Sequence, residues 1–328
     1  MLLRNIVALA VVLLSPGLAV AQGGAGGSGS QVDTEHSEVV SPFGGTGRKR
    51  IGYGRLITND LIGDGKDRWR TGSITTSRIY GYSWDGTAPA QFGELLELRI
   101  QGQIIAPQDL TTADPSDRPW AGALSFGLHS HMQRGKAEYA LGADLVVIGP
   151  QTHLDSLQDT LHDWFGAPRP SDDMLAMQIP NKIRPTLVAE AGQVVDLGHS
   201  VSLRPFAEAR AGDETLVRIG ADFNFGTIGQ GELLVRESVT GQRYRAVYDS
   251  QPGFSFTLGG DVAYVADSVY LPENRGYQLT SRRDRLRAGL HWQRNNASAF
   301  YGVTYLGEEF VGQGEGQLTG SVRVKLRF

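Results

Sequence analysis

Residues 322–328 read Val-Arg-Val-Lys-Leu-Arg-Phe, and this stretch alternates between apolar and cationic side chains. In an extended strand successive side chains point to opposite faces, so one face here is apolar and the other is charged. Residues 216–225 and 285–292 repeat the alternation, with Val217 and Ile219 on the apolar face of the first. The pattern therefore predicts an antiparallel sheet with one apolar and one polar face.

The end of the chain favours a membrane-spanning barrel over a soluble β-protein, which is the alternative. Phe328 closes an amphipathic strand with an aromatic residue, placed as in the interfacial girdles of outer-membrane barrels. The best apolar run in the body of the chain, residues 145–148, is far shorter than the roughly 20 residues that a transmembrane helix needs. We therefore predict an all-β fold, a transmembrane antiparallel β-barrel in the bacterial outer membrane.

The N-terminus carries the features of a secretory signal peptide. Arg4 precedes a short apolar run at residues 6–14, and Ala-Val-Ala at residues 19–21 is a small-x-small cleavage site. A retained membrane anchor is the alternative interpretation. The predicted divisions are a signal peptide at residues 1–21, a flexible Gly/Ser-rich segment at 22–50 and the barrel at 51–328.

Net charge and cysteine content limit the kinds of partner and metal site that the chain can have. The net charge is -4, so electrostatics give no case for a nucleic-acid partner. The chain has no cysteine, which excludes a disulfide framework and a cysteine metal site. We expect a monomer.

Alternation and turn residues predict about twelve strands. They are residues 53–60, 70–83, 92–105, 118–133, 136–148, 182–195, 200–211, 214–225, 253–269, 279–293, 297–307 and 316–328. An even count places both termini on the periplasmic side, with tight turns at 134–135 and 295–296. The long connection at 149–181 then lies outside the cell. Residues 226–252 are counted as periplasmic although they are long, and an extra strand pair or a short helix is expected there.

The long outer connection contains a predicted amphipathic helix at residues 155–166, Asp-Ser-Leu-Gln-Asp-Thr-Leu-His-Asp-Trp-Phe-Gly. Its expected apolar face consists of Leu154, Leu157, Leu161 and Phe165. Gln158 and His162 are four residues apart and project from the same side of the helix. We expect the helix to press this pair onto the rim of the barrel.

Three polar clusters are predicted at the same outer rim: Asn59-Asp60, residues 64–71 and Asp117-Arg118. A histidine that acts as a general base, beside oxygen ligands for a hard cation, suits hydrolysis of an ester by water. Calcium is the expected metal, with the oxygens of Asn59 and Asp60 and a backbone carbonyl as ligands. Each cluster also has an ordinary interpretation as turn, solvated loop or surface histidine.

Several short motifs occur in a fixed order along the chain. They are Asn59-Asp60, Asp67-Arg68-Trp69-Arg70-Thr71-Gly72, Ile104-Ile105-Ala106-Pro107, Asp117-Arg118-Pro119-Trp120-Ala121-Gly122, Ile148-Gly149-Pro150, Gln158-x-x-x-His162 and Gln178. In this order, on a signal-bearing barrel, they resemble the outer-membrane lipid A 3′-O-deacylase family. The resemblance covers about residues 53–328 and is strongest before residue 181.

The resemblance implies a twelve-stranded barrel with its site between the wall and a loop helix. The substrate would be lipid A of lipopolysaccharide in the outer leaflet, which would lose its 3′-linked acyloxyacyl group. His162 would activate water, Gln158 would orient water or substrate, and Ca²⁺ near Asn59, Asp60 and Thr71 would polarise the ester carbonyl. The cations expected to bind the substrate at the rim are Lys66, Arg68 and Arg118.

Departures from the family pattern leave other functions open. Pro168 stands where some members carry Glu, and Asn181-Lys182 replaces an Asn-Glu-like pair. The outer loop at 108–116 is acidic and lacks basic residues that some members have. The alternatives are a non-catalytic barrel, such as a narrow porin or structural protein with a degenerate site, and an esterase for glycerophospholipid. No Gly-x-Ser-x-Gly motif in a convincing context supports a serine nucleophile.

Overall fold

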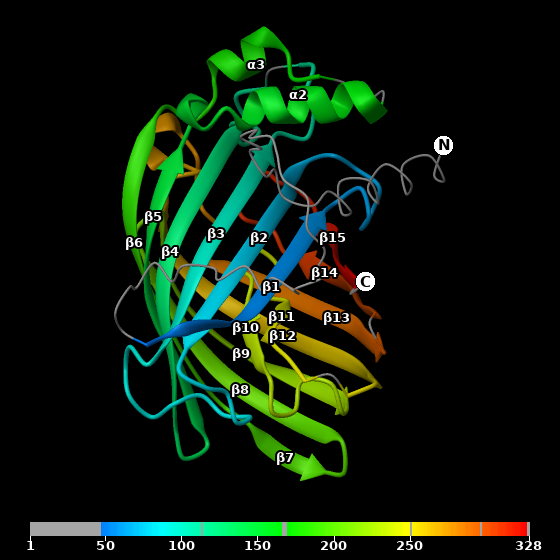
Figure 1. The fold of residues 1–328 in the computed structure, drawn as a ribbon. Helices are drawn as coiled ribbons and strands as arrows, with labels where there is room; N and C mark the ends of the chain where they lie inside the picture. The colour runs from blue at the N-terminus through cyan, green and yellow to red at the C-terminus, as the bar shows by residue number, and fades with distance from the viewer. Residues whose placement is uncertain (1–46, 113, 166–168, 250, 296, 327–328) are drawn as a thin grey trace, which may run out of the picture.

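The computed structural model describes residues 47–112, 114–165, 169–249, 251–295 and 297–326. In it the chain forms a closed antiparallel β-barrel (Figure 1). The wall strands are β1 (Lys49–Asn59), β2 (Trp69–Gly81), β3 (Leu95–Ala106), β4 (Ala121–Arg134), β5 (Ala137–Ile148), β6 (Lys182–Gln193), β7 (Val195–Gly198), β8 (Val201–Ala211), β9 (Glu214–Gly226), β12 (Gly253–Ser268), β13 (Arg282–Arg294), β14 (Ala297–Leu306) and β15 (Gln317–Leu326). The described residues contain no helix long and apolar enough to span a membrane.

The twelve predicted strands are all present, and the predicted fold class is confirmed. Apart from the short β7, each strand pairs with the next one along the wall, so that β6 pairs with β8, and the pairing of β1 with β15 closes the ring. The short β7 pairs only with β8, so it extends the β6–β8 edge and adds no wall position. Strand β1 begins at Lys49. The predicted signal peptide and residues 22–46 lie outside the described residues.

The barrel is apolar outside and charged inside. On β13, Leu286 is 62% exposed, whereas the alternating Arg285 and Arg287 are only 3% and 4% exposed. A soluble protein would bury the leucine and expose the arginines. This reversed burial is the pattern of a barrel whose outer face contacts lipid.

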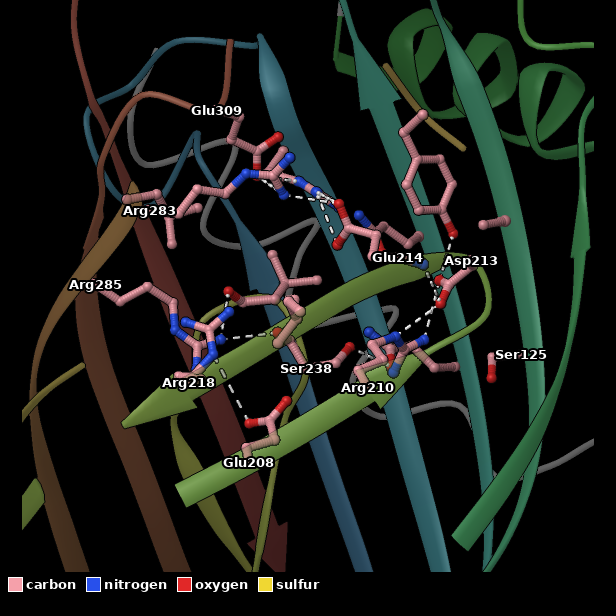
Figure 2. A pocket seen from close by; sticks show the side chains of 18 of the residues that line it. Ser125, Glu208, Arg210, Asp213, Glu214, Arg218, Ser238, Arg283, Arg285 and Glu309 are labelled. Carbon is pink, nitrogen blue, oxygen red and sulfur yellow. Dashed lines mark hydrogen bonds and ion pairs between the residues drawn. The ribbon is translucent and has the colours of Figure 1, made fainter. Parts of the chain in front are cut away.

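Ion pairs fill the extracellular half of the lumen (Figure 2). Arg283 donates to Glu214 at 2.7 Å, and Arg70 donates to Glu309 at 2.8 Å. The cavity left among these side chains has a volume of about 50 Å³, which is room for a few water molecules. The outer end of the lumen is therefore packed with paired charges.

The connection between β9 and β12 folds back into the lumen. Of the two alternatives expected there, an extra strand pair or a short helix, it contains the strand pair: β10 (Leu233–Arg236) and β11 (Arg243–Val247) form an antiparallel hairpin. The hairpin packs on the inner face of β1 so closely that a Cβ on Gly54 would lie 2.8 Å from the ring of Tyr244. The strand count correctly gave the ends of this segment. Its predicted periplasmic location is wrong, because the hairpin lies inside the lumen.

Polar side chains fix the hairpin to the wall on several sides. Arg236 donates to Glu190 of β6 and to Asp222 of β9, each at 2.9 Å. Glu237, at the tip, accepts a hydrogen bond of 2.9 Å from Gln101 of β3. Gln242 donates to backbone carbonyls of β13 and β14. These contacts reach across the lumen, so the hairpin acts as a plug; we call residues 227–252 the lumen plug.

Two helices lie above the extracellular ends of β2, β3 and β4 (Figure 1). They are α2 (Leu154–Phe165), which confirms the predicted helix, and α3 (Asp172–Ala176). The apolar cluster beneath them consists of Ala106, Leu110, Trp120, Leu154 and Met174, with Ile104 and Leu124 packed against it. Ile104 and Leu124 share the outward parity of the exposed Ile100 and Phe126. The helices therefore rest on the outer side of the rim, beside the lipid-facing surface.

Candidate active site

The side of helix α2 that faces the barrel carries both apolar and polar residues. Leu154, Gln158 and His162 are buried at spacings of four residues, whereas Leu157 is 49% exposed. The side chains of Leu161 and Phe165 are not among those described. The expected apolar face is therefore exposed at Leu157, whereas the expectation that Gln158 and His162 press onto the rim is confirmed. The reason is that the rim offers polar partners for Gln158 and His162, which outweigh one more leucine contact.

Four side chains from three segments form a continuous polar chain beneath α2. His162 Nε2 lies 2.9 Å from Asp67 Oδ2. The other oxygen of Asp67 accepts a hydrogen bond from the hydroxyl of Thr71, which also lies 3.3 Å from Asp60 Oδ1. Asp60, Thr71 and His162, which the sequence singled out, are thus brought together, with Asp67 as the link.

Asp60 is a fully buried carboxylate in the loop after β1. Its Oδ2 accepts hydrogen bonds from the backbone N–H of Arg68 at 2.7 Å and from the side chain of Gln317 at 3.2 Å. Burial raises the pKa of Asp60 to about 8, and the charges of Asp67 and Asp64 act in the same direction. A neighbouring cation would favour its ionised form.

Asn59 is placed differently from the other predicted site residues. Its side-chain oxygen accepts a hydrogen bond of 2.8 Å from the N–H of Leu61, which is ordinary turn geometry. Its amide nitrogen lies beside Gly72, 3.2 Å from where a Cβ would be.

Gln158 anchors α2 to the motif that precedes β4. Its side-chain oxygen accepts a hydrogen bond of 2.8 Å from the indole N–H of Trp120, and both groups are buried. Trp120 is also part of the apolar cluster that holds Leu154. Gln158 therefore attaches α2 to the barrel one helical turn before His162, and this contact helps to position the imidazole at the rim.

Replacing Trp120 by Phe removes the indole N–H donor and keeps an aromatic ring at this position. We expect the docking of α2 to lose about 1–3 kcal/mol, because the buried oxygen of Gln158 is left without a partner. Limited proteolysis of the 149–181 loop in detergent measures that loss, with Trp84→Phe as the control on a periplasmic loop, where the indole bonds to Gly231. Equal cleavage rates in Trp120→Phe and wild type would contradict the anchoring role.

The three cations expected to bind substrate lie in different surroundings. Lys66 is exposed, with its ammonium 3.2 Å from Glu315. Arg68 is buried between Asp64 and Glu315, and Arg118 is buried against Glu309 at 2.6 Å. Burial alone would raise the pKa of Glu309, but the charges of Arg70 and Arg118 hold it below its usual range. This geometry gives Arg68 and Arg118 structural partners and leaves Lys66 at the surface.

Sequence reasoning missed three contributors to the site. Asp67 stood within a recognised motif but was given no role, and Trp120 was not connected with Gln158. Gln317 of β15 donates to Asp60 and to the backbone carbonyl of Arg68, at 3.2 and 2.6 Å. Only closure of the barrel brings it there, and no local pattern around residue 317 signals the contact.

Comparisons with known proteins agree with this architecture. The model of the family described as outer membrane protein LpxR matches residues 37–328. The solved structure of LpxR from Salmonella typhimurium superposes with a TM-score of 0.70 at 16% identity, covering 84% of this chain and 100% of that one. The NanC and KdgM porins match with TM-scores of 0.38 and 0.36, at 6% and 9% identity, over 84% of this chain and 100% and 98% of their own. No curated protein sequence matches the chain.

The Salmonella structure is too distant in sequence to show more than the fold. The family match extends over most of the chain, including every wall strand and helix α2. It confirms the resemblance that the motifs indicated, and with the barrel it places the protein in the bacterial outer membrane. This chain belongs to the family of outer membrane protein LpxR.

Proposed function

We propose that this protein is an outer-membrane esterase that removes the 3′-linked acyloxyacyl group from lipid A. The observation that carries the proposal is the chain of contacts His162–Asp67–Thr71–Asp60 under α2. It combines an imidazole that can accept a proton with buried carboxylate and hydroxyl oxygens. That combination suits attack of water on an ester.

In the proposed reaction His162 takes a proton from a water molecule, and the water oxygen attacks the carbonyl carbon of the ester. The tetrahedral intermediate collapses with cleavage of the bond between the acyl carbon and the sugar oxygen. The imidazolium returns its proton to the leaving alkoxide. The products are a carboxylic acid and lipid A with a free 3′ hydroxyl.

The oxygens at the site suit calcium in their chemistry. Calcium prefers carboxylate, hydroxyl, carbonyl and water oxygens, and the Asp60 carboxylate and the Thr71 hydroxyl lie 3.3 Å apart. Among the described residues no three His, Cys, Asp or Glu side chains converge as a metal cluster, so water, backbone or substrate would complete the shell. Asp60 and Thr71 would hold the ion, which when bound would polarise the ester carbonyl.

Replacing Asp60 by Asn is expected to weaken calcium binding at least about tenfold, because even indirect partners of metal ligands contribute 10–100-fold. Isothermal titration of calcium into the detergent-solubilised protein measures this directly, and calcium dependence of hydrolysis measures it independently. Magnesium serves as the control ion, since its smaller shell suits the site less well. Identical calcium affinity in wild type and Asp60→Asn would exclude Asp60 as a ligand.

The position of α2 supports a lipid substrate. The helix rests on Ile104 and Leu124, which belong to the outward face of the wall, and not on the lumen side. A lipid in the outer leaflet could therefore reach His162 sideways, without leaving the membrane. Lys66, exposed at the rim, is available for a phosphate of lipid A.

Purified protein with lipid A in mixed micelles tests the proposal. We expect release of the acyloxyacyl acid in the presence of calcium and none with a calcium chelator. Offering glycerophospholipid as a competing substrate separates the lipid A activity from a general phospholipase. If the protein hydrolyses glycerophospholipid and not lipid A, the proposal is rejected and the alternative of a glycerophospholipid esterase is supported.

The alternative of a narrow porin is opposed by the filled lumen. The lumen plug contacts β1, β3, β6, β9, β13 and β14, and ion pairs close the outer half. A cavity of about 410 Å³ lies on the periplasmic half, lined partly by Trp84, Arg243 and Tyr139. These features support a closed barrel.

A further inference from the structure

Asp67 occupies the position between the proposed base and the rest of the site. One carboxylate oxygen lies 2.9 Å from His162 Nε2, and the other accepts the hydroxyl hydrogen of Thr71. Its side chain is 31% exposed, while that of His162 is 10% exposed. Asp67 is thus the group through which the β1–β2 loop contacts helix α2 at the imidazole.

We propose that Asp67 is a positioning residue for His162, a role that rests on the proposed function. A carboxylate that accepts a hydrogen bond from one ring nitrogen fixes the orientation and tautomer of the imidazole. His162 Nε2 lies within hydrogen-bond distance of Asp67 Oδ2, and assigning the ring hydrogen to that contact makes Nδ1 the nitrogen that takes the proton from water. The same carboxylate stabilises the imidazolium that forms when the proton arrives.

The Thr71 hydroxyl makes this positioning specific. It donates to Asp67 Oδ1, which leaves Oδ2 for the imidazole, so the carboxylate plane is set by a neighbour on β2. Thr71 also approaches Asp60. The orientation of the base and the oxygens proposed for the cation therefore depend on one hydroxyl, which fixes the geometry between them.

Asp67→Asn tests this role, because Asn keeps the size of the side chain and removes the charge. We expect kcat for lipid A to fall about 10²-fold or more with KM within about threefold, since a lost orienting carboxylate acts on the transition state. Asp67→Glu should recover part of that loss. Asp163→Asn is the control, because it removes an exposed carboxylate that lies on the helix of His162 and pairs with the exposed Arg169.

The outcomes separate the possible roles. A kcat for Asp67→Asn above half of the wild-type value would overturn the proposal. So would full recovery of kcat at raised calcium, which would make Asp67 a metal ligand instead. If Asp67→Asn loses activity and also loses the heat-modifiable electrophoretic mobility of a folded barrel, the role of Asp67 is structural and the proposal is overturned. An inactive wild type would reject the proposed function itself, whereas an active wild type with an inactive His162→Ala and a fully active Asp67→Asn would reject only this inference.

Discussion

His162→Ala is expected to lower the rate of lipid A deacylation by about 10²- to 10⁴-fold, the usual contribution of a general base. An imidazole can accept a proton from water, and that of His162 is buried against Asp67 beneath α2. Alanine leaves the carboxylates in place but removes the acceptor. The measurement is the initial rate of acyl release from lipid A by purified protein at saturating calcium.

The barrel itself should not depend on this imidazole. His162 lies on a loop helix outside the wall, so His162→Ala should retain heat-modifiable mobility. His199→Ala is the matched control, because His199 is exposed in the turn between β7 and β8, remote from the site. A His162→Ala protein that keeps more than a tenth of the wild-type rate would show that another group is the base.

Removal of the lumen plug is expected to turn a closed barrel into an ion-conducting one. Residues 227–252 contribute no wall strand, and Gly226 is paired with Ser255, so the ends of β9 and β12 already lie side by side. A two-residue Asn-Gly turn can join such strands. The plug contacts the wall from β1 to β14, and its Ser238 and Val239 carbonyls accept hydrogen bonds from Arg285 at 2.8 and 3.1 Å. Its loss therefore empties the periplasmic half of the lumen and also removes partners from the charged cluster in the outer half.

Conductance in planar lipid bilayers measures the effect. We expect no steady channels from wild type and stable channels from the protein with the Asn-Gly turn. Because the shortened barrel also loses ion-pair partners such as Arg236 with Glu190, its folding is checked first by heat-modifiable mobility. A folded, shortened barrel that conducts no ions would show that the outer ion pairs close the lumen without the plug. Channels from wild type would favour the porin alternative.

The wall could be predicted from the sequence because alternation is a local signal. Most strands have one apolar and one polar face, and lipid outside with charges inside makes the signal strong, as at Leu286 and Arg285. The helix at 154–165 was visible for the same reason, since its spacing is local. The strand pair inside residues 226–252 was expected, but its place in the lumen was not.

The lumen plug could not be placed because its contacts, polar pairs and an apolar cluster with inner-face residues such as Leu56 and Ile79, are all long-range. Arg236 bonds to Glu190, which is 46 positions away, and such long-range pairs produce no periodic pattern in the sequence. The site shows the same limit. Motifs identified Asp60, Thr71 and His162, but the role of Asp67 and the contact from Gln317 depend on closure of the barrel. Asn59 is next to Asp60 in sequence and yet caps its own turn.

Mass spectrometry of lipid A from cells tests the central proposal most directly. Lipid A is extracted from a host that makes the 3′-acyloxyacylated form and carries either the wild-type gene, the His162→Ala gene or an empty vector. We expect wild type to produce a species lighter by one acyloxyacyl group, and His162→Ala to match the empty vector. Lipid A of unchanged mass in cells with folded wild-type protein in the outer membrane, supplied with calcium, would contradict it.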